Sequence, residues 1–487
     1  MQRGRYLRLL RAISNNITND ETMTDILLLQ PRHIYAPDYQ EASIGHIYMP
    51  TSLLTVCARL LAAGVHVKIE DENISRSELS CPCVGVNLVG SPYVASARMI
   101  LHRLRVKYNN FTVLLGGQVV SGFREEEFAS LFGRASINGN RDSNIKSLLK
   151  LKSPLPEPEQ TSLIPAYQYI EDHVMSMYLE NEFCFFLSGG CKYGCLFCAA
   201  HHTRRDILTG NTIQVREAYR SQRCIEDDLS YLMARAAALR VRQLKVYLSN
   251  LDLFQTPVQL KAFAETVVAV RNRYSSVGLS MRGLSTVQSF LLAHDNCPEV
   301  ISLMVTAGLE RVGFGVDGAT EEVFRRTKKA QQTPTTCVRA IQTARETYGL
   351  TPETLMVFGH VGVDTEDSLR AACSFTEWAM ERFGSLPRPH VAKSVIPGNE
   401  GWREESSRQL RQRLLEKPSL FQVLDFTATP SPLTHSDDRF RDAVTQSFLK
   451  ICDLPGNVTQ YVLPEWPCDD HQELERVRAF NKGRYDL

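Results

Sequence analysis

The fold of this chain is decided by the stretch Phe185-Phe186-Leu187-Ser188-Gly189-Gly190-Cys191-Lys192-Tyr193-Gly194-Cys195-Leu196-Phe197-Cys198. An apolar run typical of a buried strand ends in a glycine pair, and three cysteines follow with the spacing CxxxCxxC. Three thiolates on one short loop can hold three irons of a [4Fe–4S] cluster and leave the fourth iron open to an outside ligand. Cys191, Cys195 and Cys198 are therefore the predicted metal ligands, and Gly189-Gly190 lets the backbone bend tightly enough to aim their sulfurs at one point.

Zinc is the main alternative to iron as the metal that these thiolates could bind. A zinc site would usually bring a second CxxC or a His pair at a regular distance, and the nearby His201-His202 could supply a fourth ligand. Disulfides are disfavoured, because the chain has 13 cysteines, an odd number, and opens without the pattern of a signal peptide. We therefore expect a reducing, cytoplasmic compartment.

The length and composition of the chain limit the classes of protein to which it can belong. With 487 residues, the chain is long enough for about three units. Its 55 basic and 54 acidic side chains nearly cancel, which does not match the charge of a nucleic-acid binder. No apolar run approaches the thickness of a bilayer, so we expect neither nucleic acid nor a membrane as a partner.

Residues 25–150, after a polar N-terminal extension over 1–24, alternate between apolar runs and amphipathic segments. The expected strands are 26–29, 65–69, 84–88 and 111–115, and the expected helices are 51–63 and 95–108. This alternation predicts an α/β domain with a doubly wound, Rossmann-like sheet. Such sheets bind ligands at the carboxyl ends of their strands, which makes Asn87, Gly116 and Gly117 candidate binding residues.

Three further segments complete the chain. Residues 151–180 are predicted to be a proline-rich linker, extended and semi-rigid. Residues 181–400 carry a second β/α series, and residues 401–487 are expected to form a small C-terminal cap with helices over 404–415 and 439–452. The strands of the second series are expected at 183–187, 244–248, 277–281, 311–315, 354–358 and 390–395. Six such units predict a partial (β/α)6 barrel with its active site at the carboxyl ends of the strands.

The cysteine loop, with the aromatic Phe197 before its last cysteine, resembles the signature of the radical S-adenosylmethionine superfamily. The upstream domain is similar to the cobalamin-binding domain of the B12-dependent branch, through Leu61-Ala62-Ala63-Gly64 and Leu114-Leu115-Gly116-Gly117. The chain lacks an Asp-x-His-x-x-Gly element, and Ile137-Asn138-Gly139-Asn140-Arg141 stands where many relatives carry Gly-Glu-Gly-Glu. A degenerate domain that binds no corrin therefore stays an alternative.

The resemblance also implies contacts to S-adenosylmethionine. Asn250 or Asp252, after the second barrel strand, would touch the methionyl amino group, although Asp252 equally fits a helix N-cap. Arg282, on the third strand, would clamp the methionyl carboxylate through two hydrogen bonds, unless it lies on the surface. Asp317, in an element similar to Gly-Ile-Glu-Ser, would approach the ribose, and Phe197 would lie beside the cofactor.

The function that this resemblance implies is that of a cobalamin-dependent radical S-adenosylmethionine methyltransferase. It would act on an unactivated carbon of a small metabolite or natural-product intermediate, with an external electron donor such as flavodoxin or ferredoxin. A radical isomerase, dehydratase or ring-rearranging enzyme on the same scaffold is the first alternative, and a non-catalytic cobalamin or iron–sulfur sensor is a distant one. The sequence singles out no general acid or base. Methyl transfer requires the strand ends of the first domain to face the mouth of the barrel.

Overall fold

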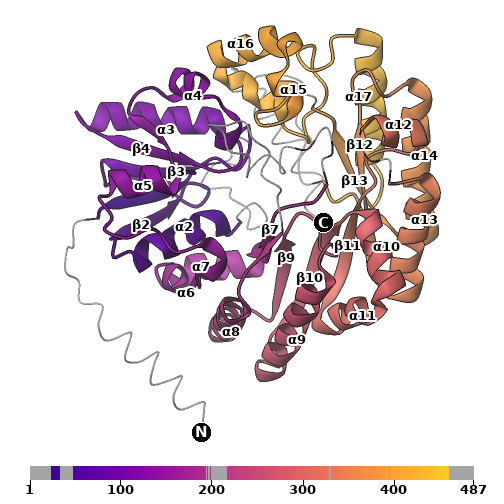
Figure 1. Cartoon of the computed structure of the whole chain (residues 1–487), viewed down its shortest axis with the longest axis horizontal. Helices are drawn as coiled ribbons and strands as arrows, with labels where there is room; N and C mark the ends of the chain where they lie inside the picture. Colours follow the sequence, from indigo (N-terminus) through magenta and orange to yellow (C-terminus); the bar gives the residue numbers. More distant parts are fainter. Residues whose placement is uncertain are drawn as a thin grey trace.

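The computed structural model describes residues 24–32, 48–193, 195, 198, 217–327, 329, 331–393 and 395–459. Two parallel sheets dominate it, one near the N-terminus and one in the middle of the chain, as Figure 1 shows. None of the described helices is long and apolar enough to cross a membrane. The fold is the predicted α/β architecture, with a doubly wound domain, a partial barrel and a C-terminal cap.

The first sheet has the strand order β2-β1-β3-β4-β5, and its described pairs are all parallel. Its strands are β1 (Ile26–Gln30), β2 (Val67–Asp71), β3 (Cys83–Asn87), β4 (Thr112–Gly116) and β5 (Ser136–Asn138). Its helices are α2 (Thr51–Ala62), α3 (Tyr93–Lys107), α4 (Glu125–Phe132) and α5 (Asp142–Leu148). The four predicted strands and two predicted helices are confirmed within a few residues, whereas the short β5 was not predicted. Chain order reverses between β1 and β3, which is where open sheets of this kind bind ligands.

The two faces of this sheet have different partners. Ile26 and Leu28 belong to a core that continues through α2 into the barrel. Leu27 and Leu29, on the opposite face, belong to a second core with α3, α4 and part of the C-terminal cap. Because side chains alternate along a strand, β1 is buried on both faces, which explains why it is a continuous apolar run.

The second sheet has the order β13-β12-β11-β10-β9-β6 and is also parallel throughout. Its strands are β6 (Glu182–Phe186), β9 (Gln243–Ser249), β10 (Gly278–Ser285), β11 (Leu309–Gly315), β12 (Thr351–Phe358) and β13 (Leu386–Val391). Its main helices are α8 (Gln222–Ala238), α9 (Pro257–Arg273), α10 (Val287–Asn296), α11 (Pro298–Ala307), α12 (Glu321–Arg326), α13 (Pro334–Gln342) and α14 (Glu366–Phe383). β6 and β13 are the two edges, so the barrel is partial as predicted.

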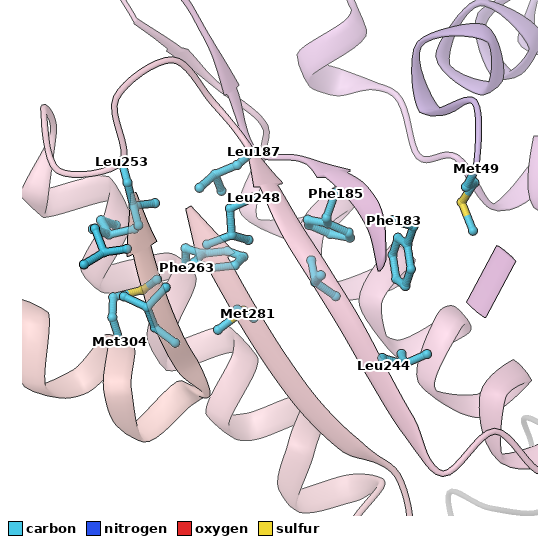
Figure 2. Packing of buried hydrophobic residues seen from close by; sticks show 14 of the residues in the cluster. Met49, Phe183, Phe185, Leu187, Leu244, Leu248, Leu253, Phe263, Met281 and Met304 are labelled. Carbon is cyan, nitrogen blue, oxygen red and sulfur yellow. The ribbon is translucent and has the colours of Figure 1, made fainter. Parts of the chain in front are cut away.

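Apolar side chains of the barrel strands pack outward against the helices. Figure 2 shows Phe183 and Phe185 of β6, Leu248 of β9 and Met281 of β10 in this packing, with Phe263 of α9. The alternate residues of the same strands therefore face the barrel interior. β13 begins four residues earlier than predicted, because its prolines are tolerated on an edge strand.

The proline-rich segment corrects one prediction. Instead of an extended linker, it contains η3 (Pro158–Gln160), α6 (Ile164–Tyr167) and α7 (Asp172–Glu180). Pro165 lies in the first turn of α6, where the missing N–H has no helical partner to lose. Leu163, Ala166, Tyr167 and Ile170 are buried in the core that the two domains share, and their helical spacing is the reason the segment packs.

The C-terminal cap packs partly against the first domain and partly against the barrel. Its elements are α15 (Glu400–Arg403), η6 (Glu405–Ser407), α16 (Arg408–Glu416), η7 (Pro418–Leu424) and α17 (Asp438–Cys452), so both predicted helices are present. Figure 1 shows α15 and α16 above the first domain and α17 beside α14 of the barrel. Trp402 is fully buried against Phe123 and Phe421, and its indole Nε1 donates to Glu127 of α4 at 3.1 Å. The aromatic end beyond residue 459 lies outside the described residues.

Candidate active site

The cysteine loop leaves the barrel through a short antiparallel pair, β7 (Ser188–Gly189) with β8 (Ala218–Tyr219), that the sequence did not predict. Gly190 adopts a φ of 105°, a conformation open to glycine but rare for other residues. The side chain of Gln255 holds the loop, since its Nε2 donates to the Gly190 carbonyl at 2.9 Å and its Oε1 accepts from the Lys192 N–H at 3.3 Å.

The three predicted ligands lie together. Burial raises the pKa of Cys191 to about 12 and that of Cys195 to about 11, and Cys198 adds to both shifts through its charge. Thiols in this setting ionise only beside a compensating cation, which iron provides. Among the described residues no three His, Cys, Asp or Glu side chains surround a single ion, but a cluster binds each thiolate to a different iron. The donor set fits a [4Fe–4S] cluster; Phe197 and His201-His202 lie outside the described residues.

Asn250 follows β9 at the carboxyl end of the barrel. It is only 5% exposed, and neither its carboxamide oxygen nor its nitrogen has a hydrogen-bond partner among the described residues. An unpaired buried amide costs free energy unless a ligand satisfies it. The side chain lines a cavity, described below, and is therefore available to a bound molecule.

Asp252 stabilises the start of a helix, which agrees in kind with the capping role that the sequence offered beside contact with the methionyl amino group. Its fully buried carboxylate accepts hydrogen bonds from Ser285 Oγ at 3.0 Å, Thr286 N and Oγ1 at 3.1 Å, and Ser289 Oγ at 2.6 Å. These groups form the turn from β10 into α10, so the carboxylate stabilises a helix N-terminus rather than facing a ligand. Contact between Asn250 and the methionyl amino group stays a prediction, and the carboxamide of Asn250 is the one of these two side chains without a hydrogen-bond partner among the described residues.

Arg282 lies inside the barrel, which corrects the alternative of a surface position. Its Nε donates to Glu182 at 2.6 Å, and its guanidinium lies 4.3 Å from the ring centroid of Tyr247. Arg311 and Arg388 complete the layer around Glu353, with Arg388 Nη2 at 3.0 Å and Arg311 Nη1 at 3.4 Å from that carboxylate. Glu182 engages the Nε, so only a clamp that used this nitrogen would have to break the ion pair, and the bidentate contact of Arg282 with the methionyl carboxylate stays a prediction.

Asp317 lies two residues beyond the end of β11 in a left-handed conformation, with a φ of 56°. Its carboxylate forms an ion pair with Lys329, which is 4% exposed and which also donates to the Gly315 carbonyl at 2.7 Å. His360, after β12, and His390, on β13, are close enough for the charge of Asp317 to act on them, and burial lowers the pKa of both imidazoles, to about 4 for His390. Sequence reasoning missed Lys329 and both histidines, because their burial has no signature in the residue pattern.

The carboxyl edge of the first sheet carries the other predicted residues. Asn87 Nδ2 donates to Gln30 Oε1 at 2.9 Å, which joins β3 to β1 at the point where strand order reverses. Asn87, Gly116 and Gly117 line a cavity of about 200 Å³ between the sheet and α2. Gly117 has a φ of 111°, and a Cβ there would lie 2.3 Å from the Leu88 carbonyl oxygen, so only glycine fits.

Asn140 stabilises the carboxyl edge of the first sheet through hydrogen bonds, a role that the sequence did not reveal. Its Nδ2 donates to the Gly117 carbonyl at 2.8 Å and to Ser121 Oγ at 2.7 Å, while its Oδ1 accepts from the Gly117 N–H at 2.8 Å. The residue belongs to the segment that replaces the acidic run of many relatives. Its carboxamide therefore fixes the Gly117 turn by binding both the N–H and the carbonyl group of Gly117.

A second cavity, of about 480 Å³, lies between the two domains. Gly117, Gln118 and Asn140 line it from the first domain, and Asn250 and Tyr247 line it from the barrel. None of the described residues that line it carries a charged side chain. The expectation that the strand ends of the first domain face the barrel mouth is confirmed.

A close backbone contact sets the distance across this cavity. Gly122, beyond β4, packs against Pro397 and Gly398 after β13, and a Cβ on Gly122 would lie 2.2 Å from the Pro397 carbonyl carbon. The turn that contains Pro397 and Gly398 is thus a point where the first domain touches the barrel.

Comparison with known proteins agrees with this arrangement. The sequence model of the radical SAM superfamily matches residues 185–372. Among solved structures, the chain is similar to the radical S-adenosylmethionine methyltransferase TsrM from Kitasatospora setae, determined with a tryptophan substrate and a cofactor analogue, with a TM-score of 0.55 and 15% identity over 79% of this chain and 76% of that one. It is also similar to the cobalamin-dependent S-adenosylmethionine radical enzyme OxsB, determined with aqua-cobalamin and S-adenosylmethionine, with a TM-score of 0.55 and 13% identity over 81% of this chain and 55% of that one. No curated protein sequence matches significantly.

Proposed function

We propose that this chain is a radical S-adenosylmethionine enzyme and, more specifically, a cobalamin-dependent methyltransferase acting on an unactivated carbon of a small metabolite or natural-product intermediate. The match of the superfamily's sequence model to residues 185–372 supports the first part of the proposal. The observation that carries the proposal is the shared cavity, in which the carboxyl edge of the first sheet faces that of the barrel through Gly117 and Asn250. Transfer of a methyl group between a corrin and a carbon radical requires both cofactors to face one substrate.

The cofactors carry the difficult chemistry. When bound, the cluster and S-adenosylmethionine supply a 5′-deoxyadenosyl radical that removes hydrogen from carbon, and methylcobalamin supplies the methyl group. An external one-electron donor such as flavodoxin or ferredoxin would supply the electron for this chemistry. The protein's own part is to hold these groups, to orient the substrate and to exclude water.

Individual residues divide this task. Cys191, Cys195 and Cys198 hold the iron, and the unpaired carboxamide of Asn250 orients the methionyl end of S-adenosylmethionine. Gly117, with the smaller cavity beside it, supports the corrin. The carboxylate of Asp317 approaches the ribose and is held in place by its ion pair with Lys329.

The uncharged lining of the shared cavity supports a substrate whose reacting part is neutral and forms hydrogen bonds. Apart from the methionyl groups of S-adenosylmethionine, which the open iron of the cluster would bind, a carboxylate or ammonium group placed there would lose its hydration without a compensating charge from the described lining residues. Charged groups of the substrate would therefore remain outside the cavity.

The test is anaerobic incubation of the reconstituted full chain with cobalamin, a reductant and S-adenosylmethionine, followed by analysis of nucleoside products. Formation of both 5′-deoxyadenosine and S-adenosylhomocysteine supports methyl transfer. Formation of 5′-deoxyadenosine alone favours a radical isomerase, dehydratase or ring-rearranging enzyme, and formation of neither favours a sensor.

The cluster is tested separately by the triple variant C191A/C195A/C198A, with C373A as the control. Cys373 is a buried cysteine of α14 whose Sγ faces the Ser447 carbonyl, so its removal should leave the iron content unchanged. The triple variant should lose both iron and the cluster spectrum. Unchanged iron in that variant would refute the assignment of the loop.

A further inference from the structure

A layer of charged side chains crosses the interior of the barrel. Its members come from five of the six barrel strands and are Glu182, Arg282, Arg311, Glu353 and Arg388. Arg282 Nε and Arg311 Nη2 both donate to the carboxylate of Glu182, at 2.6 Å and 3.0 Å. Arg388 Nη2 forms an ion pair with Glu353 at 3.0 Å. We call these five residues the arginine layer.

The arginine layer carries one more positive charge than negative charge, because three guanidiniums face two carboxylates. Three neighbouring acids stay neutral at neutral pH, since burial raises the pKa of Cys184 to about 11, that of Tyr247 to about 12 and that of Tyr48 as well. Burial also lowers the pKa of Arg388, a shift that Glu353 opposes and Arg282 increases. A buried charge without a counter-charge costs free energy, so the layer favours one further anion.

Most N–H groups of the three guanidiniums have no hydrogen-bond partner among the described residues. The two bonds to Glu182 are the exceptions. Arg388 Nε is buried without an acceptor, and neither oxygen of Glu353 accepts a hydrogen bond although ion pairs surround it. The side chains of Arg282 and Arg388 are only 11% and 17% exposed. Buried donors are normally satisfied, and the planar donors of arginine fit a carboxylate or phosphate group best.

Tyr247 joins the arginine layer to the cavity between the two domains. It lines that cavity from β9, and it pairs in register with Arg282 on β10. The guanidinium of Arg282 lies 4.3 Å from the centroid of the Tyr247 ring. A molecule whose neutral part occupies the cavity can therefore place a second group beyond this ring, beside the guanidiniums.

We propose that the arginine layer binds one carboxylate or phosphate group of the substrate. The proposal rests on the proposed function and adds a substrate class to it, namely a small molecule with a neutral reacting part and an anionic end. One such anion would balance the charge of the layer and accept hydrogen bonds from the unpaired N–H groups. The uncharged lining of the shared cavity agrees with this division, because the anionic end would lie outside that lining.

The experiment measures thermal unfolding of the reconstituted full chain at increasing concentrations of inorganic phosphate, with ionic strength held constant by sodium chloride. An anion that binds only the folded state raises the unfolding midpoint in a saturable way, which we expect for the wild type. R388M removes the surplus charge and should weaken the apparent affinity for phosphate by roughly tenfold, the effect of one charged hydrogen-bonding partner. R408M changes an arginine of α16 that is 74% exposed, and as the control it should respond like the wild type.

C184D is a second test that keeps all three arginines. Cys184 lies opposite Tyr247 in the register of β6 and β9, and the charge of Arg282 acts on it. A carboxylate at this position would supply the missing anion from within the chain. This variant should unfold at a higher temperature than the wild type when phosphate is absent, and it should not respond to phosphate. If R388M does not fold, C184D decides.

A saturable response of the wild type that weakens in R388M and disappears in C184D supports the proposal. No response in the wild type, or an unchanged response in both variants, would overturn it. Equilibrium dialysis identifies the source of the anion, because phosphate that competes with S-adenosylmethionine in the wild type would assign the layer to the methionyl carboxylate and overturn the proposal. A protein that forms S-adenosylhomocysteine but ignores phosphate would refute this site and keep methyl transfer. Phosphate binding without S-adenosylhomocysteine would support the site and count against methyl transfer.

Discussion

Asn250 and Asp252 lie two residues apart and should respond to mutation in opposite ways. The Asp252 carboxylate accepts four hydrogen bonds and is fully buried, whereas the Asn250 carboxamide has no partner among the described residues. D252A leaves the donors of Ser285, Thr286 and Ser289 without their acceptor. A buried donor without a partner costs about 1–3 kcal/mol, and hydroxyls can turn to other acceptors, so we expect a total loss of about 3 kcal/mol in the free energy of unfolding. That loss corresponds to a roughly 150-fold change in the unfolding equilibrium.

N250A removes an amide that costs the apoprotein free energy, so the free energy of unfolding should stay unchanged or rise slightly. Its affinity for S-adenosylmethionine should fall by roughly 10- to 100-fold, the effect of one hydrogen bond to a charged group. Urea unfolding followed by circular dichroism measures stability, and equilibrium dialysis of the reconstituted protein measures binding. The reasoning is refuted if D252A is as stable as wild type, or if N250A binds S-adenosylmethionine normally.

Three further changes test the first domain and the cap. G117A should abolish cobalamin retention, measured by absorbance after gel filtration, because its Cβ would collide with Leu88 and its φ of 111° disfavours alanine. N140A should weaken cobalamin binding by roughly tenfold, the effect of about 1.4 kcal/mol, by freeing the Gly117 turn; unaltered affinity would contradict its positioning role. Burial lowers the pKa of Lys393 from 10.5 to about 7, so the unfolded chain binds more protons between those values and stability rises with pH. K393M should flatten that rise in urea unfolding between pH 7 and pH 9, and an unchanged slope would show that Lys393 does not cause it.

Sequence reasoning succeeded where burial leaves a pattern. Buried parallel strands such as β1 are continuous apolar runs, which the sequence shows directly. The spacing of the cysteines can also be read directly from the sequence. It was less accurate for the proline-rich segment, because prolines dominated the interpretation although the apolar spacing around Tyr167 was that of a packed helix. The strand positions were thus predictable from local composition, whereas the packing of a short helix depends on its neighbours.

The polar interior of the barrel could not be predicted from the sequence. Arg282 looks the same on a surface and in an ion pair, and its partners Glu182 and Glu353 lie 100 and 71 residues away in the chain. Lys329 has the same ambiguity, since lysine side chains are mostly exposed in folded proteins and this one is 4% exposed. Such residues become recognisable only when the fold brings strands from distant parts of the sequence into one layer.

The spacing between the two candidate cofactor sites is set by packing rather than by the linker. One face of the first sheet shares a core with the barrel through α2 and α6, and the other shares a core with the cap around Trp402. Both contacts hold the edge that carries Gly117 over the barrel mouth. Gly122 then touches Pro397 backbone to backbone, at a distance that leaves no room for a side chain. Because packed interfaces resist small displacements, this close contact would keep the cavity of about 480 Å³ at a constant width, as the proposed transfer of a methyl group between two cofactors would require.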